Sequence, residues 1–111
     1  MKAILISIRP KWCMKIFERQ KTVEIRKRAP QIEPPFKCYI YCTKATMDDK
    51  TQLLVNGDIG NGKVIGEFIC DDAKEISVPR PAYRHEMDEK ILRDSCLSYE
   101  ELRWQAETPL S

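Results

Sequence analysis

The sequence predicts a single domain of the α+β class that spans residues 1–111. Short segments rich in β-branched and aromatic residues, which are typical of strands, occupy much of the first 78 residues. Apolar residues recur at helical spacing after Pro10 and again after Pro81. With 42% hydrophobic and 32% charged residues, the chain has the composition of a folded protein, and its length suffices for one core.

The first predicted elements are a strand at Ala3–Ile8 (AILISI) and a helix that ends near Gln20. The strand is rich in β-branched residues. Pro10 suits the first turn of the helix, where its missing N–H would lack a partner in any case. The helix is predicted from four apolar residues at helical spacing: Trp12, Cys13, Ile16 and Phe17.

Residues Thr22–Arg28 are predicted as the second strand. Alternate side chains of a strand face opposite ways, so Val23 and Ile25 would share one face. Lys21 would stand at the strand entrance, and the other face would carry four polar side chains: Thr22, Glu24, Arg26 and Arg28. This mostly cationic surface suits an anionic or hydrogen-bonding ligand. An ordinary ion pair on a solvated strand explains the same pattern, and both interpretations stay open.

Three further strands are expected. A proline-rich loop at Ala29–Phe36 leads to the clearest one, Lys37–Thr43. Its side chains form two faces, Cys38/Ile40/Cys42 and Tyr39/Tyr41/Thr43. Residues 45–62 form a polar connection with turn signals at Asn56-Gly57 and Asn61-Gly62, whose glycines lack the spacing of a phosphate-binding loop. The remaining strands are predicted at Lys63–Cys70 and Glu75–Val78.

The C-terminal part is predicted to be helical. A helix at Tyr83–Arg93 would turn three apolar residues inward: Met87, Ile91 and Leu92. The sequence Ser98-Tyr99-Glu100-Glu101 is a capping box, which opens a short last helix that carries Leu102.

The cysteines and the single histidine do not predict a disulfide or a metal site. On a strand, Cys38 and Cys42 would lie about 13 Å apart, too far for a disulfide or for shared zinc ligation. We expect reduced, half-buried thiols and no cofactor. No apolar run is long enough to span a membrane, and Arg9-Pro10 ends the first apolar stretch, so a cytoplasmic protein with no membrane partner is expected.

Charge is distributed unevenly along the chain. The 19 basic and 17 acidic residues nearly balance. Residues 1–44, however, carry eleven basic and three acidic residues (11 − 3 = +8), and residues 45–111 carry eight and fourteen (8 − 14 = −6). Such asymmetry is a hint of a surface that faces nucleic acid.

Five segments occur in a recognisable order: Ile6–Pro10 (ISIRP), Lys21–Arg26 (KTVEIR), Tyr39–Lys44 (YIYCTK), Gly62–Phe68 (GKVIGEF) and Ser95–Leu102 (SCLSYEEL). This order, over almost the whole chain, resembles the ASCH domain family of the PUA-like superfamily. The resemblance implies a small, partly open mixed β-barrel flanked by two or three helices, with a cleft around Lys21, Glu24 and Arg26. Family members resemble RNA-binding modules, some are amidohydrolases that act on an acylated cytidine, and ribonuclease activity has been proposed for others.

The chain departs from the family pattern at two places. The family usually has a glycine at the position of Arg19, where a left-handed residue ends the preceding helix. Members also continue after the last helix into a closing strand, whereas this chain ends at Thr108–Ser111. An open barrel edge is therefore expected, with self-association through strand pairing, or displacement of the residues after about Glu101.

The main functional hypothesis is an RNA- or nucleotide-binding module. Cationic side chains would contact phosphates, Tyr39 or Tyr41 would stack on a base, and Glu24 would accept a base amino group or orient Arg26. The candidate ligand-binding residues are Lys21, Thr22, Glu24, Arg26, Arg28, Tyr39, Tyr41, Thr43 and Lys44.

The alternative is a small amidohydrolase for acylated pyrimidine nucleosides, or a ribonuclease, in the same cleft. Hydrolase-type members have a nucleophilic threonine three positions after the lysine, where this chain has Glu24. Glu24 would then be the general base for water, and Lys21 would stabilise the oxyanion. A further glutamate would assist, from the candidates Glu67, Glu75 and Glu86. Two other interpretations stay open. In one, both tyrosines lie in the core and all the charges are solvated, and in the other the acidic C-terminal half binds a basic protein partner.

Overall fold

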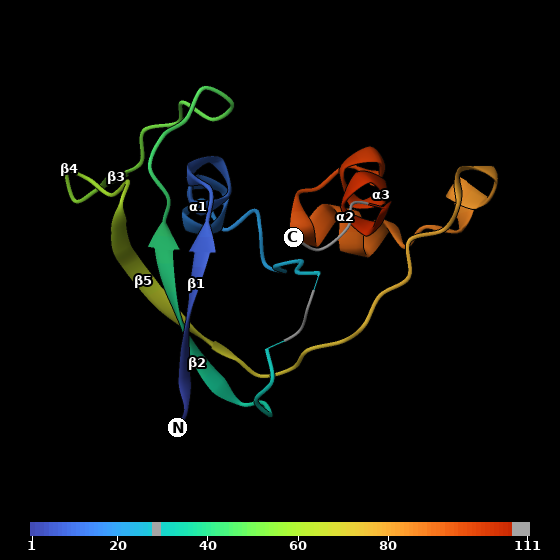
Figure 1. Ribbon diagram of the computed structural model, residues 1–111, viewed down its shortest axis with the longest axis horizontal. Helices are drawn as coiled ribbons and strands as arrows, with labels where there is room; N and C mark the ends of the chain where they lie inside the picture. The colour runs from blue at the N-terminus through green and yellow to red at the C-terminus, as the bar shows by residue number, and fades with distance from the viewer. Residues whose placement is uncertain (28–29, 108–111) are drawn as a thin grey trace.

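The computed structural model describes residues 1–27 and 30–107 and confirms the α+β class. Figure 1 shows a sheet with helix α1 on one side, and a group of helices from the C-terminal part beside it. The elements in chain order are β1 (Ala3–Ile8), α1 (Pro10–Phe17), β2 (Phe36–Cys42), β3 (Leu54–Val55), β4 (Asp58–Ile59), β5 (Lys63–Cys70), the 3-10 helix η1 (Pro81–Glu86), α2 (Glu89–Ser95) and α3 (Tyr99–Glu107).

The main sheet is mixed and has the strand order β1-β2-β5. β1 runs parallel to β2, and β2 runs antiparallel to β5, with an irregularity in register between Ile40 and Tyr41. The predicted strands at the chain start, at residues 37–43 and at residues 63–70 are confirmed to within one residue at each end. Over the ranges that the structure describes, the sheet has these three strands and does not close into a barrel.

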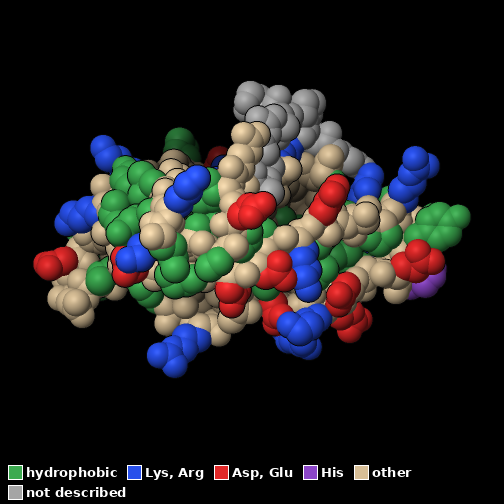
Figure 2. All heavy atoms as spheres, turned by 90° about the horizontal axis from the view of Figure 1, so that it is seen from below, with side chains coloured by type: hydrophobic (Ala, Val, Ile, Leu, Met, Phe, Trp, Pro, Cys, Tyr) green, Lys and Arg blue, Asp and Glu red, His purple; other side chains and the backbone are tan. Residues whose placement is uncertain are grey.

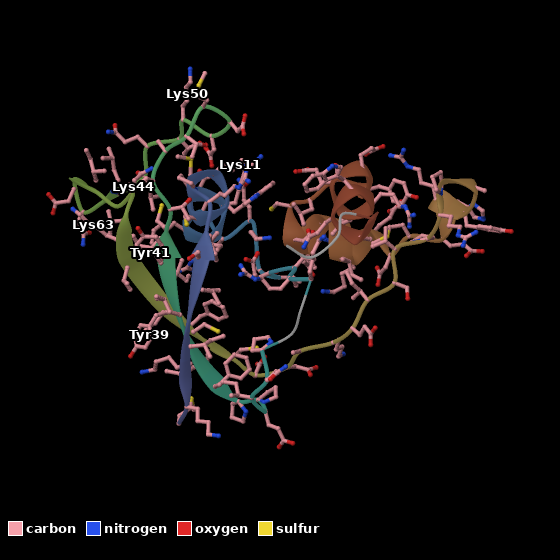
Figure 3. All side chains as sticks on the ribbon, viewed as in Figure 1. Lys11, Tyr39, Tyr41, Lys44, Lys50 and Lys63 are labelled. Atoms are coloured by element: carbon pink, nitrogen blue, oxygen red, sulfur yellow. The ribbon has the colours of Figure 1, made fainter. Side chains whose placement is uncertain are left out.

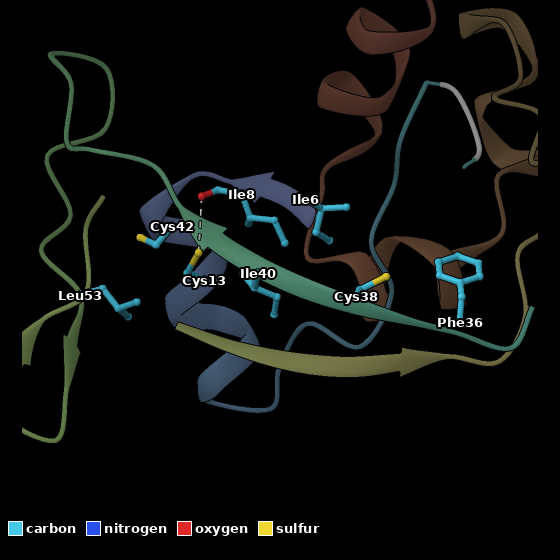
Figure 4. Packing of buried hydrophobic residues seen from close by; sticks show 8 residues of the cluster. All are labelled: Ile6, Ile8, Cys13, Phe36, Cys38, Ile40, Cys42 and Leu53. Atoms are coloured by element: carbon cyan, nitrogen blue, oxygen red, sulfur yellow. Dashed lines mark hydrogen bonds between the residues drawn. The ribbon is translucent and has the colours of Figure 1, made fainter. Parts of the chain in front are cut away.

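The core lies between the sheet and α1. Every second residue of β1 and β2 is buried there, as the alternation predicted. Figure 4 shows these side chains and Cys13 of α1 packed together, with Leu53 at one end. A second, smaller core holds Met87, Tyr99 and Leu102 in the helical part of the chain.

Two connections adopt the local structures that their sequences favour. The Asn56-Gly57 turn joins β3 to β4 as a hairpin, with both residues at positive φ. Asp49, from the loop after β2, accepts hydrogen bonds from the backbone N–H groups of Lys11 and Thr51 and so caps the first turn of α1. Burial alone would raise the pKa of Asp49, but these N–H donors outweigh it and hold the pKa below its ordinary value.

The predicted strand at Thr22–Arg28 is wrong for the residues that the structure describes, and Arg28 lies outside them. Residues 21–27 form no regular element, and the N–H groups at the start of the segment have partners outside a sheet. Thr22 and Val23 both donate to the carbonyl of Asp94, at 2.7 and 3.0 Å. The segment therefore docks on the C-terminal end of α2 and does not join a strand ladder.

The C-terminal predictions are partly confirmed. Residues 71–80 form no strand, so the strand at Glu75–Val78 is wrong. The helix predicted at Tyr83–Arg93 is broken, because η1 ends at Glu86 and α2 begins only at Glu89, with extended backbone at Met87 between them. The inward positions of Met87, Ile91 and Leu92 are confirmed, and so is the capping box, in which Ser98 and Glu101 exchange hydrogen bonds.

Helix α1 is followed by a left-handed residue at the position where the resemblance implies glycine. Arg19 has φ of 61°, and its N–H donates to the carbonyl of Ile16. The helix thus ends with a left-handed residue that is not glycine, and this conformation costs about 1–2 kcal/mol.

Replacing Arg19 by Gly is expected to raise the free energy of unfolding by about 0.5–1 kcal/mol, because relief of strain exceeds the extra freedom of glycine in the unfolded chain. Urea unfolding measures this difference. Glu18→Gly is the matched control, since Glu18 has right-handed φ of −77° and glycine there should lower stability. A loss of stability in Arg19→Gly would contradict the explanation by strain.

Candidate functional site

Lys21 is the best-buried charged side chain of the candidate site, with 2% of its side chain exposed. Its Nζ donates to the backbone carbonyl of Ser95 at 2.7 Å and lies 3.3 Å from Oε1 of Glu24. The ring of Trp12 lies 5.5 Å from the same ammonium group. A cation at the carbonyl end of α2 also matches the negative end of the helix dipole. Lys21 therefore joins the sheet part of the molecule to the helical part.

Glu24 connects Lys21 to Arg26. Its other carboxylate oxygen, Oε2, lies 3.4 Å from an amino group of Arg26. The same group of Arg26 donates to the carbonyl of Ser7 on β1, at 3.1 Å. The predicted proximity of these charges is thus present although the strand is not, and the three groups form a +, −, + row that starts in the interior and ends at the half-exposed Arg26.

A cavity of about 470 Å³ opens beside this row of charges. Residues 21–24 form one wall, and β5 forms the other, with Ile40 of β2 between them. Its lining is mainly apolar and contains two phenylalanines: Ile8, Ile16, Phe17, Lys21, Thr22, Val23, Glu24, Ile40, Gly66, Glu67, Phe68 and Ile69. We call this cavity the Lys21 pocket. Its size and its few polar groups are typical of small-molecule sites.

The structure separates the predicted site residues into two groups. Lys21, Thr22 and Glu24 line the Lys21 pocket, and Arg26 adjoins Glu24. Tyr39 and Tyr41 lie on the other face of β2, because Ile40 between them faces the pocket. Thr43 and Lys44 follow the end of β2, where the Thr43 N–H donates to the Ile8 carbonyl. The tyrosines therefore cannot stack on a ligand inside the pocket.

Several pocket residues were not singled out from the sequence. Phe17 was expected to face the core, as part of the helical periodicity of α1. Phe68 belongs to the Gly62–Phe68 segment, which indicated a family resemblance but no site residue. The partner of Lys21, the Ser95 carbonyl, is 74 positions away along the chain and carries no sequence signal. Of the glutamates considered as a second carboxylate, Glu67 lines the pocket, whereas Glu75 and Glu86 are exposed elsewhere. The Glu67 carboxylate lies 3.7 Å from the ammonium group of Lys37.

Thiol chemistry does not contribute to this site. Cys13 and Cys42 are fully buried, and burial, followed by the neighbouring Cys42 thiol, raises the pKa of Cys13 well above its ordinary value. A thiol in this state is a poor nucleophile. All five cysteines are unpaired in the structure.

No family model, curated protein or solved structure matches the chain in the comparisons with known proteins. Within the described residues, no three His, Cys, Asp or Glu side chains come together as metal ligands. The same residues contain no helix with the length and apolarity needed to cross a membrane.

Proposed function

We propose that this chain is an ASCH-type module that binds RNA or a nucleotide-like ligand in the Lys21 pocket. The observation that carries the proposal is the ion pair of buried Lys21 and partly buried Glu24 on the wall of a mainly apolar cavity. Buried charges are costly to maintain and are concentrated at functional sites. The ordered motifs that resemble the ASCH family place their lysine and glutamate at these same positions.

A PUA-like, partly open barrel is the finer fold that we propose. Residues 21–24 stand across the pocket from β5, and Arg26 reaches the backbone of β1. An irregular segment thus occupies the side of the sheet where a barrel would need a further strand. The β-edge left open by such a barrel is where the expected self-association would occur.

The charges around the pocket favour a nucleotide with its base inside and its phosphate outside. The positive charge of Lys21 is already matched by Glu24, so the interior suits a neutral group with hydrogen-bonding edges. Phe17 and Phe68 supply apolar surface for a base, and Thr22 supplies a hydroxyl group. Arg26 is half exposed at the end of the charge row, where a guanidinium can bind a phosphate in water.

A nucleotide panel tests this assignment. We expect cytidine and uridine 5′-monophosphates to raise the melting temperature more than the corresponding nucleosides, because Arg26 adds a phosphate contact. A ligand at 100 times its Kd adds about 2.7 kcal/mol to the free energy of unfolding. Arg26→Gln should remove the advantage of the monophosphates, and Lys74→Gln, a control at an exposed lysine that pairs with Asp72, should retain it. No stabilisation by any of these compounds would overturn the pocket assignment.

The same pair supports hydrolysis of an acylated cytidine as the second candidate function. Glu24 would take a proton from water as the water oxygen attacks the amide carbonyl, and Lys21 would stabilise the oxyanion. Glu24 would then return this proton to the N4 nitrogen as the C–N bond breaks, which releases a carboxylic acid and the nucleoside amine. Glu24→Gln should then reduce the rate of N4-acetylcytidine hydrolysis by about 100-fold while binding persists. If the wild type releases no acetate, the chain is a binder alone.

A further inference from the structure

The sheet has a second face, which points away from the pocket and is not covered by any element that the structure describes. We call it the outer face. Its members are paired across the strands by register, as Leu5 with Tyr39 and as Tyr41 with Val64. Tyr39 is 37% exposed, Val64 is 55% exposed and Leu5 is 60% exposed. Figure 2 shows apolar side chains gathered on the sheet half of the molecule, with Lys and Arg side chains around them.

We propose that the outer face binds single-stranded RNA, as a surface distinct from the Lys21 pocket. Tyr39 and Tyr41 would each stack on one base, and Lys44 and Lys63 would contact the phosphates between and beyond them. RNA as the class of ligand rests on the proposed function, whereas the location is a different one. The sheet itself separates the two sites, since Ile40 lines the pocket and its two neighbours in β2 face outward.

The spacing of the tyrosines suits two successive bases of an unpaired strand. Residues i and i+2 of a β-strand lie on one face about 6.7 Å apart. That spacing is about twice the distance between successive bases in a stacked strand. Each tyrosine ring can therefore stack on one base of a strand whose bases are unstacked from one another. Figure 3 shows Tyr39 and Tyr41 following one another along β2, with Lys44 and Lys63 beyond Tyr41. Aromatic rings on a sheet surface are a recurrent platform for single-stranded RNA.

The charges at this end of the sheet complement a phosphate backbone. Lys63 opens β5 in register with the last residue of β2, and Gly62 before it has φ of 78°. A Cβ at Gly62 would lie 3.3 Å from Cγ of Lys44, so the Lys44 stem passes directly over this turn. Lys44 and Lys63 are both exposed at this end of the sheet, next to the last tyrosine of β2. The opposite end is nearer neutral, because Lys37 beside Tyr39 is paired with Glu67.

Fluorescence anisotropy of a labelled oligouridylate of about ten nucleotides, a length within the usual site size, tests the surface at low salt. We expect Tyr39→Leu and Tyr41→Leu each to raise Kd about tenfold, because each removes one stacking ring and keeps apolar bulk. Lys44→Gln and Lys63→Gln should each reduce the slope of log affinity against log salt by about 0.7. Tyr83→Leu on η1 and Lys74→Gln are the controls at exposed positions away from the sheet, and both should bind as the wild type does.

Several results would overturn the inference. The first is unchanged binding in the two tyrosine variants, or no binding by the wild type. The second is tighter binding of the matching oligodeoxythymidylate, which would exclude RNA as the preferred strand. The third is a dimer in sedimentation that dissociates in Tyr39→Leu, which would assign the outer face to a second copy of the chain. Loss of oligonucleotide binding in Arg26→Gln alone would place RNA at the pocket, which contradicts this surface and leaves the proposed function intact.

Discussion

Replacing Lys21 by Met is expected to lower the free energy of unfolding by about 3 kcal/mol, more than any other single charge substitution proposed for this chain. Methionine keeps the volume of the lysine stem but removes the ammonium group. The Ser95 carbonyl at the end of α2 then loses its 2.7 Å donor in a buried position. Glu24 keeps Arg26 but loses the cation that faces it from the interior. Urea unfolding at neutral pH measures the loss.

Two companion variants show whether the lysine acts as a structural link. Glu24→Gln should cost less than about 1 kcal/mol, because Glu24 is partly exposed and an amide oxygen still accepts from Lys21. Lys50→Met replaces an exposed lysine in the loop after β2 and should change stability by less than about 0.5 kcal/mol. If Lys21→Met is as stable as Lys50→Met, the contacts of Lys21 do not hold the two parts of the molecule together. Its burial would then have to be explained by ligand binding.

The parts of the fold that could be predicted are those whose structure depends on residues close together in the sequence. β1, β2 and β5 were predicted because each is a stretch of six to eight residues rich in β-branched or aromatic side chains. The last helix was found because Ser98 and Glu101 bond to one another within a single turn. The resemblance implied a glycine at the position of Arg19, which is a residue type that often ends a helix in the left-handed conformation. Arg19 has this left-handed conformation in the structure.

The parts that could not be predicted depend on partners far away in sequence. Residues 22–27 alternate like a strand, but two of their N–H groups donate to the Asp94 carbonyl. No residue near them in the sequence indicates this partner. The short alternating segment at residues 75–78 likewise lacks a strand partner among the described residues. Alternation alone placed Tyr39 and Tyr41 on one face but could not say which face adjoins Lys21. The structure brings Lys21 and Glu24 together, whereas it places Tyr39 and Tyr41, which were predicted to share a site with them, on the other face of the sheet.

Leu102→Ala should have a destabilising effect of similar size, about 2–5 kcal/mol. Leu102 is 1% exposed at the centre of the helical core, between Met87 and Tyr99, and truncation leaves a cavity that a core of this size cannot readily fill. Leu54→Ala is the matched control, because Leu54 is 60% exposed in the hairpin and the same truncation there should cost less than about 0.5 kcal/mol. Urea unfolding compares the two variants.

The effect of Leu102→Ala should extend to the Lys21 pocket, which Leu102 does not line. α2 packs on the helical core and presents the carbonyls of Asp94 and Ser95 to residues 21–23. Weakening that core should therefore speed hydrogen exchange at the Thr22 and Val23 amides. Exchange at the amides of β2, which lie within the other core, should change less. Unchanged exchange at Thr22 and Val23 in a destabilised Leu102→Ala would show that the sheet part holds the pocket wall by itself. Faster exchange there would show that the helical part of the chain sets the position of Lys21 and Glu24, and hence any ligand affinity that depends on them.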